Sequence, residues 1–481
     1  MKLFRFADFW NRRTLDNSAE RIERVLFDRT RRLVAGLYID ERFENVWGSL
    51  VVARGRGKTL RVLFCESASR PIPDVIRDSC RELSKGNFSS ADYRNSIAEL
   101  ADVQTAMVEE LKLKAGKYVD RVLAVSVVDP GIWQNDYRGE ISWMSLCDAT
   151  RLAERTGANV IDAWPDRDIA VGGKGQPLDP LCLWLLLADR DRRIARKANF
   201  CISVKNQTTG YLLPPSDGLD ADSPDLRPLP TEGLELIEGI LKLSSIEPSS
   251  DKVRQLLVSG VHSKELLSLW QQLPQSDQPR TVSMLQAASS PQIANLSAEQ
   301  LLCTTMKWIS DDCQKMILNA LREFEEDWSA KRARLKRELE STERISARKG
   351  IEMLRAFDDS LPEFSSPGCI MVEAPAAISD ALVSRLRILF DGIRVSGSWR
   401  EILPGNLEQR GAAEVHGPSL SAALLGFFHV DQVPANLPSL TGADQLRILG
   451  RLTPGRPNAW RNLLREMADY EPSAMKLRDA V

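Results

Sequence analysis

Short apolar runs rich in Val, Ile and Leu, bounded by glycine or charged residues, recur through the first part of the chain. Runs of this length and composition are typical of strands with at least one buried face. They predict strands near residues 31–39, 46–54, 59–66, 121–129, 141–146 and 158–164. The first three follow one another closely, with GRGK as a tight turn between the second and third, which predicts a β-meander.

Apolar residues between and after these strands recur at helical spacing. The spacing predicts helices over residues 74–85, 90–115, 148–157 and 181–193, followed by a hairpin of strands at 198–205 and 208–214. Gly157 stands where a C-cap glycine belongs. Strands and helices mixed in this order predict a layered α/β fold.

The composition changes after the hairpin. Residues 210–230 are rich in Pro, Ser, Asp and Gly, which predicts a surface loop or linker. Residues 231–357 are helical in pattern, and mixed charges over 321–357 suit a long, mostly solvated helix that serves as a scaffold or as a partner-binding arm. Beyond it the pattern predicts strands at 368–374 and 392–399 and helices at 379–390, 419–430 and 459–470.

The composition limits the classes of partner. With 481 residues the chain is long enough for two or three domains. The 64 Lys and Arg residues nearly balance the 66 Asp and Glu residues, so we expect no nucleic-acid or anionic-membrane partner. No run approaches the roughly 20 apolar residues of a membrane span, and the first residues do not resemble a secretory signal, although a short amphipathic surface helix remains an alternative. We expect a cytoplasmic protein.

Cysteine and histidine give no metal-site pattern. The eight cysteines are scattered without a CxxC pair, and the three histidines, His262, His416 and His429, lie far apart in sequence. The pattern predicts free thiols in a reducing compartment and no metal site.

Two glycine-containing stretches invite a phosphate-binding interpretation. A P-loop would require a glycine at position 52, where this chain has Val52, and would lead into a helix rather than a strand. GRGKT at 55–59 therefore predicts a hairpin turn. The stretch DRDIAVGGKGQP at 166–177 instead joins a strand to a helix, where α/β proteins bind ligands. Gly172, Gly173 and Gly175 permit close backbone approach, and Asp168 could act as a general base or, with Asp166 and Arg167, simply brace the loop.

Two longer segments carry a family resemblance. Residues 151–180, RLAERTGANVIDAWPDRDIAVGGKGQPLDP, closely resemble the central signature of anhydro-N-acetylmuramic acid kinases, and residues 434–455, PANLPSLTGADQLRILGRLTPG, are similar to that family's Pro-Gly-Asn-Leu-Pro-x-Val-Thr-Gly-Ala segment. The resemblance covers most of the chain, except about thirty N-terminal residues and much of the region after Thr231. It implies an actin-like sugar-kinase fold with two ribonuclease-H-like α/β domains and a helical insertion. We assign residues 1–30 to an N-terminal arm, 31–120 and about 441–481 to the first domain, 121–228 and 359–440 to the second, and 229–358 to the insertion.

The resemblance also implies a reaction. Members of the family use ATP and Mg²⁺ to open the 1,6-anhydro ring of a cell-wall amino sugar with water and to phosphorylate its O6, in peptidoglycan recycling. By the family motif Asp168 would activate the water, and Arg167 with Gly172, Gly173 and Gly175 would shape the sugar pocket.

The stretches that hold phosphate in the family differ here. Phosphoryl transfer depends on backbone cradles and charge neutralisation. The corresponding segments of this chain are YIDERFEN (38–45), SVVDPG (126–131), SVKN (203–206), GLDADSPDLRP (218–228) and MVEAP (371–375). These differences favour a non-catalytic relative that works as a sensor, a scaffold or a partner of an active paralogue, as a homodimer or with another protein. An active kinase with unusual phosphate contacts and a nucleotide-independent reaction at Asp168 remain alternatives.

Overall fold

The computed structural model describes residues 30–468, apart from 87, 136–140, 189–196, 205–206, 216–226, 233, 244–261, 274–280, 291–294, 342–346, 359–362, 375 and 404–414. The chain divides into two compact units, each with its own hydrophobic core. Unit 1 comprises Met1–Leu186 and Leu403–Val481, and unit 2 comprises Leu187–Ile402.

The sheet of unit 1 has the strand order β13-β7-β4-β1-β2-β3. Its strands are β1 (Arg31–Ile39), β2 (Asn45–Arg54), β3 (Arg61–Pro71), β4 (Val122–Val128), β7 (Val160–Asp162) and β13 (Arg451–Thr453). β1 pairs in parallel with β4 and β4 with β7, whereas β2 is antiparallel to both of its neighbours. Without the edge strand β13, the sheet read from β3 has the order β3-β2-β1-β4-β7. This is the ribonuclease-H-like order 3-2-1-4-5, with β7 as the fifth strand, so the predicted fold class is confirmed for this unit.

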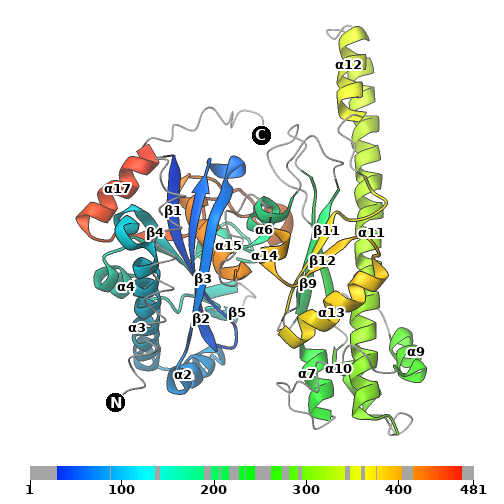
Figure 1. The fold of residues 1–481 in the computed structure, drawn as a ribbon, viewed down its shortest axis with the longest axis horizontal. Coiled ribbons are helices and arrows are strands. Elements are labelled where there is room, and N and C mark those ends of the chain that lie inside the picture. Colours follow the sequence, from blue (N-terminus) through cyan, green and yellow to red (C-terminus); the bar gives the residue numbers. More distant parts are fainter. Residues whose placement is uncertain are drawn as a thin grey trace. The chain divides into compact units, whose positions relative to one another are not determined.

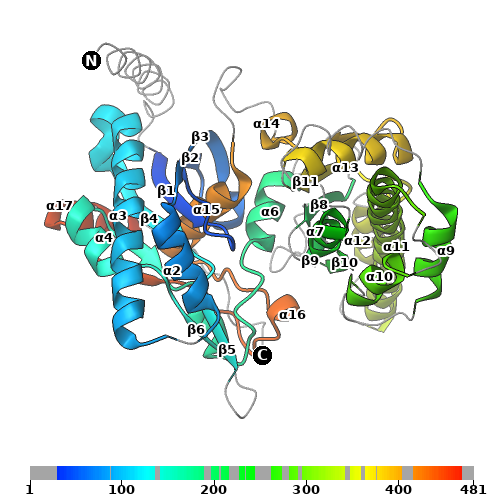
Figure 2. The same ribbon diagram turned by 90° about the horizontal axis from the view of Figure 1, so that it is seen from below.

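Helices cover both faces of this sheet. Figure 2 shows α3 (Ser90–Ala115) and α15 (Gly417–Val430) on opposite sides of the strands. A Cβ at Gly36 of β1 would lie 2.4 Å from the backbone nitrogen of Ala423 in α15, so the helix and strand backbones meet directly there. The remaining elements of unit 1 are η1 (Gly57–Thr59), α2 (Asp74–Ser84), η2 (Gly116–Arg121), β5 (Ile132–Asn135), β6 (Ile141–Met144), α4 (Ala149–Thr156), α5 (Asp166–Ile169), α6 (Pro180–Leu187, which ends at the unit boundary), α16 (Pro438–Thr441) and α17 (Pro457–Ala468). The short helix α14 (Trp399–Ile402) is the last element of unit 2.

Unit 2 repeats the same topology. Its sheet has the order β10-β9-β8-β11-β12, with β8 (Asn199–Val204), β9 (Gln207–Leu213), β10 (Arg227–Glu232), β11 (Cys369–Glu373) and β12 (Arg394–Ser396). β8, β11 and β12 are parallel, and β9 is antiparallel to β8 and β10. The sequence predicted a loop over the residues of β10 that precede 231, because Pro228 and Pro230 lie there. Proline is tolerated in this strand because β10 is at the edge of the sheet.

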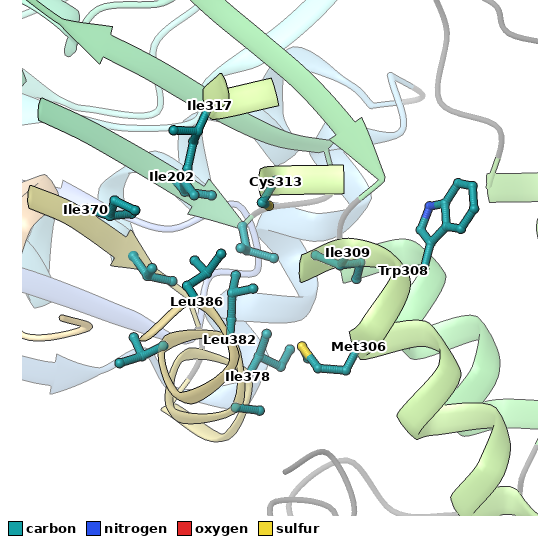
Figure 3. Close-up of a cluster of buried hydrophobic side chains, with 14 of the residues drawn as sticks. Ile202, Met306, Trp308, Ile309, Cys313, Ile317, Ile370, Ile378, Leu382 and Leu386 are labelled. Atoms are coloured by element: carbon teal, nitrogen blue, oxygen red, sulfur yellow. The ribbon is translucent and has the colours of Figure 1, made fainter. Parts of the chain in front are cut away.

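The helical insertion lies between β10 and β11. Its described helices are α7 (Leu234–Leu243), α9 (Lys264–Gln272), α10 (Thr281–Ala288), α11 (Ala298–Ser341) and α12 (Ala347–Asp358), and α13 (Ala376–Leu389) follows β11. Figure 3 shows Ile309, Cys313 and Ile317 of α11 in one apolar cluster with residues of the sheet and of α13. The C-terminal part of α11 extends past this core and packs against α12, as Figure 1 shows. From Lys331 onward the side chains of α11 are exposed, except the half-buried Leu335 and Leu339.

The structure corrects the assigned domain boundaries. The first unit extends to Leu186 rather than to residue 120, and it resumes at Leu403 rather than near 441. The reason is strand pairing: Leu37 of β1 pairs with Val127 of β4, so a boundary at 120 would divide one sheet. α15 likewise packs on β1, β2 and β4 and belongs to unit 1. In the described part of the chain, no helix is long and apolar enough to cross a membrane.

Candidate functional site

The parallel strands β1, β4 and β7 end side by side at one edge of the unit 1 sheet. In sheets of this kind the carboxyl edge is where ligands bind. Three segments follow these strand ends: the turn 40–44, the residues after Val128, and the loop 163–175. The residues predicted from the sequence motif lie in the third segment.

Asp168 lies in the single helical turn α5 within that loop, and its side chain is fully buried. Its Oδ2 accepts a hydrogen bond of 2.9 Å from the backbone N–H of Gly175. Its Oδ1 accepts bonds of 2.9 Å each from Asn436 Nδ2 and Thr441 Oγ1. A buried carboxylate with three donors is a strong structural brace. The bracing role considered for Asp168 is therefore present in the structure.

These bonds join the two motifs that carry the family resemblance. Backbone bonds of 2.9 Å also run from Lys174 N to the Thr441 carbonyl and from Asp444 N to the Val171 carbonyl. Residues 163–175 and 434–444 thus form one interlocked assembly within unit 1. Asn436 and Thr441 were within a quoted motif, but the sequence gave no signal that they contact Asp168, because 268 and 273 residues separate them from it.

The glycines of the loop have distinct roles. A Cβ at Gly173 would lie 2.1 Å from Asp168 Oδ2, so only glycine fits against the buried carboxylate. Gly172 and Gly175 have φ values of +82° and +73°, a backbone conformation that favours glycine. Arg167 is exposed and donates to the Ile448 carbonyl at 3.4 Å, so the structure places it at the surface of the loop and away from the brace.

The turn after β1 is closed by its own carboxylate. Asp40 Oδ1 accepts the backbone N–H groups of Arg42 at 2.9 Å and Glu44 at 3.2 Å. The N–H of Phe43 bonds to the Asp40 carbonyl at 3.1 Å, and the Phe43 side chain is buried. The three backbone donors of residues 42–44 all have acceptors within the turn.

A second carboxylate closes the segment after β4. Asp129 Oδ1 accepts bonds of 2.9 Å from the N–H groups of Gly131 and Leu146, and its Oδ2 accepts one of 2.9 Å from Ser145 Oγ. Burial of the side chain raises the pKa of Asp129 from 3.8 to about 6, although the three hydrogen bonds favour the charged form. Sequence analysis did not single out Asp129, although it lies in the quoted segment 126–131.

The pKa of Asp129 predicts a pH-dependent stability. Because the pKa is raised in the folded state, the carboxyl contributes stability at low pH that is lost as the pH rises from about 4 through 6. Asp129→Asn has no carboxyl that titrates at this position, so its free energy of unfolding should rise relative to wild type as the pH increases over that range, by up to about 3 kcal/mol. The difference between the two proteins should level off above pH 7. Urea unfolding at pH 4.5 to 8 measures the difference. A difference independent of pH would contradict the assignment.

The other altered segments lie in unit 2. Glu373, the last residue of β11, accepts a hydrogen bond of 2.7 Å from Trp399 Nε1. It stands within the segment MVEAP. Lys205 and Asn206, and residues 218–226 of the remaining segment, lie outside the described residues. Among the described residues, no group of three or more His, Cys, Asp or Glu side chains is arranged to hold a metal ion.

Comparisons with known proteins find similarity to one kinase family in sequence. The sequence model of the anhydro-N-acetylmuramic acid kinase family matches residues 50–199. An anhydro-N-acetylmuramic acid kinase from Gloeobacter violaceus is 24% identical over 303 residues, which cover 61% of this chain and 76% of the relative.

Similar solved structures include two bacterial sugar kinases. A ROK family glucokinase from Streptomyces griseus, in complex with glucose and AMPPNP, is 12% identical, with 82% of this chain and 98% of that chain covered and a TM-score of 0.26. A ROK hexokinase from Thermus thermophilus is 15% identical, with 82% and 97% covered and a TM-score of 0.24. The chain is therefore similar to anhydro-N-acetylmuramic acid kinases over residues 50–199, which contain the loop braced by Asp168, and both of its units carry the ribonuclease-H-like topology.

Proposed function

We propose that this protein binds an anhydro amino sugar of the cell wall but does not transfer phosphate from ATP. The observation that carries the proposal is the pair of carboxylates, Asp40 and Asp129, that take up the backbone donors after β1 and β4. These are the segments that the family resemblance assigns to phosphate. The protein then acts as a sensor or scaffold whose state depends on the sugar.

The two carboxylates oppose phosphate binding in two ways. A backbone N–H that bonds to an internal carboxylate cannot also stabilise a phosphate oxygen, and loss of one such donor typically costs about 3 to 4 kcal/mol in the transition state. The carboxylates also place negative charge beside a ligand that is itself strongly negative. The donor set therefore does not fit the triphosphate of ATP or its Mg²⁺ complex.

The loop that the family resemblance assigns to the sugar keeps the residues of the family motif, which supports sugar binding. The family match at 50–199 includes the loop 163–175 and also the altered segment 126–131, and it excludes the altered turn 40–44. The loop is held by Asp168, Asn436 and Thr441 as a preformed structure, and preformed sites bind at a lower entropic cost. Arg167 extends from it into solvent and offers donors for a carboxylate or hydroxyl group. The relative's name as an anhydro-N-acetylmuramic acid kinase supports the choice of sugar.

The similarity to anhydro-N-acetylmuramic acid kinases favours one alternative, an active kinase that uses unusual phosphate contacts and Mg²⁺-ATP. The proposal and this alternative differ in which ligands should stabilise the folded protein. Anything that binds only the folded state stabilises it by RT ln(1 + [L]/Kd), which is about 2.7 kcal/mol at a concentration of 100 Kd.

We expect 1,6-anhydro-N-acetylmuramic acid to raise the melting temperature and millimolar Mg²⁺-ATP to leave it unchanged, with and without the sugar. Arg167→Gln should weaken the sugar-induced shift, whereas the matched change Arg348→Gln, on the exposed helix α12, should not. Mass spectrometry of the sugar after incubation with ATP gives the decisive check. A phosphorylated product would establish the kinase alternative, and a ring-opened product without phosphate would indicate a nucleotide-independent reaction, which Asp168→Asn should then abolish.

A further inference from the structure

Unit 1 contains a pocket that the proposed function does not use. It has a volume of about 590 Å³ and lies between α3, the first turn of α4 and the edge strand β13. The residues that line it are Arg94, Ile97, Ala98, Cys147, Asp148, Ala149, Thr150, Arg151, Arg451 and Thr453. Its most unusual feature is three arginines contributed by three different elements.

Two of these arginines are oriented by carboxylates that do not line the pocket. Arg451 makes a fork with Asp162 through Nε at 3.2 Å and Nη2 at 2.7 Å, which leaves Nη1 outside that fork. Arg151 Nη2 lies 3.5 Å from Asp102. Such partners fix the position of a guanidinium group while part of it stays available to a ligand.

Arg94 differs from the other two. It is exposed, and within the described part of the chain its guanidinium group has no hydrogen-bond or ion-pair partner. Asp148 is the one acid in the lining, and its Oδ1 already accepts the backbone N–H of Arg151 as the N-cap of α4. The lining residues alone carry three positive charges and one negative charge. Asp162 and Asp102 contact Arg451 and Arg151 from outside the lining and offset two of the positive charges, so the charge available to a ligand comes chiefly from Arg94.

Guanidinium groups present paired N–H donors that match the oxygens of a phosphate group. The hydroxyl groups of Thr150 and Thr453 add further donors, and Ile97 and Ala98 add an apolar wall. A phosphate dianion attached to a small organic group would contact both the hydrogen-bond donors and the apolar wall. We propose that this pocket binds the phosphate group of a small phosphorylated metabolite. Binding here does not require the loop 163–175 to bind sugar, so this inference stands or falls independently of the proposed function.

Isothermal titration at constant ionic strength tests it on the full-length protein. The probes are inorganic phosphate, glucose 6-phosphate and, as the uncharged control, glucose. We expect glucose 6-phosphate to bind and glucose not to bind. Equal affinity for inorganic phosphate and the ester would identify the ion itself as the ligand, and tighter binding of the ester would show that the apolar wall contributes.

The variant Arg94→Gln provides the specific test, because Arg94 is exposed and makes no hydrogen bond or ion pair within the described part of the chain. It should weaken phosphate binding at least about tenfold, one bidentate charge-assisted contact being worth this much or more. Arg54→Gln, an exposed arginine at the end of β2 in the same unit, should leave the affinity unchanged. The inference is overturned if neither phosphate probe binds, or if Arg94→Gln and Arg54→Gln bind as tightly as wild type.

Discussion

Replacement of Asp168 by alanine should lower the free energy of unfolding by about 3 to 5 kcal/mol. The carboxylate is fully buried and accepts bonds from Gly175, Asn436 and Thr441, so its removal leaves three buried donors without this acceptor. Each buried donor that loses its partner costs about 1 to 3 kcal/mol, and the costs are not additive. Urea denaturation followed by tryptophan fluorescence measures the loss.

The matched control is Asp166→Ala in the same helical turn. Asp166 is exposed, so the change should alter stability by less than about 1 kcal/mol. Asp168→Asn should fall between the two, because an amide keeps one acceptor oxygen but turns an N–H₂ group toward existing donors. If Asp168→Ala were as stable as Asp166→Ala, the bracing role would be wrong.

Asp431→Ala should be comparably destabilising, by about 3 to 5 kcal/mol, because it breaks a buried ion pair at the other end of β1. The fully buried Asp431 carboxylate lies 2.5 Å and 3.0 Å from Nη1 and Nη2 of Arg32, a residue that is only 6% exposed. It also accepts bonds from Arg56 at 3.2 Å and from the Gly57 N–H at 3.0 Å. Without the aspartate, the nearest remaining carboxylate partner of the buried Arg32 guanidinium group among the described residues is the partly exposed Glu466, 3.7 Å from its Nε.

Asp120→Ala, an exposed aspartate of the same unit, serves as the control and should change the free energy of unfolding by less than about 0.5 kcal/mol. The same chemical denaturation measures both variants. A loss below 1 kcal/mol in Asp431→Ala would mean that water reaches Arg32 readily in the folded state. This network lies at the amino end of β1, away from the loop 163–175, so the sugar should still raise the melting temperature of the variant.

Local patterns were sufficient to predict most individual elements. The alternation of apolar runs and turns gave the meander β1–β3, and the helical spacing after Ser89 gave α3, whose start is fixed by a capping box between Ser89 and Asp92. Such features depend on residues three or four positions apart, which the sequence displays directly. β10 was missed because its prolines are compatible with a strand only at a sheet edge, and edge position is a property of the whole sheet.

The two motifs of the candidate site could likewise be found by inspection, and the turn at Asp40 depends on residues within four positions of it. The sequence could not show that Asn436 and Thr441 satisfy Asp168, or that Leu146 donates to Asp129. Those contacts depend on how β4 and β7 bring distant segments to one sheet edge.

The sequence by itself determined the type and approximate bounds of most strands and helices, the resemblance to a kinase family, and the fact that the phosphate segments differ from the pattern of that family. Only the tertiary structure decided where unit 1 ends, which donors each buried carboxylate satisfies, and that three arginines share one pocket. The physical reason is the range of the interactions: hydrogen bonds within turns and helices join near neighbours, whereas strand pairing and buried polar contacts join residues whose separation the local pattern does not encode.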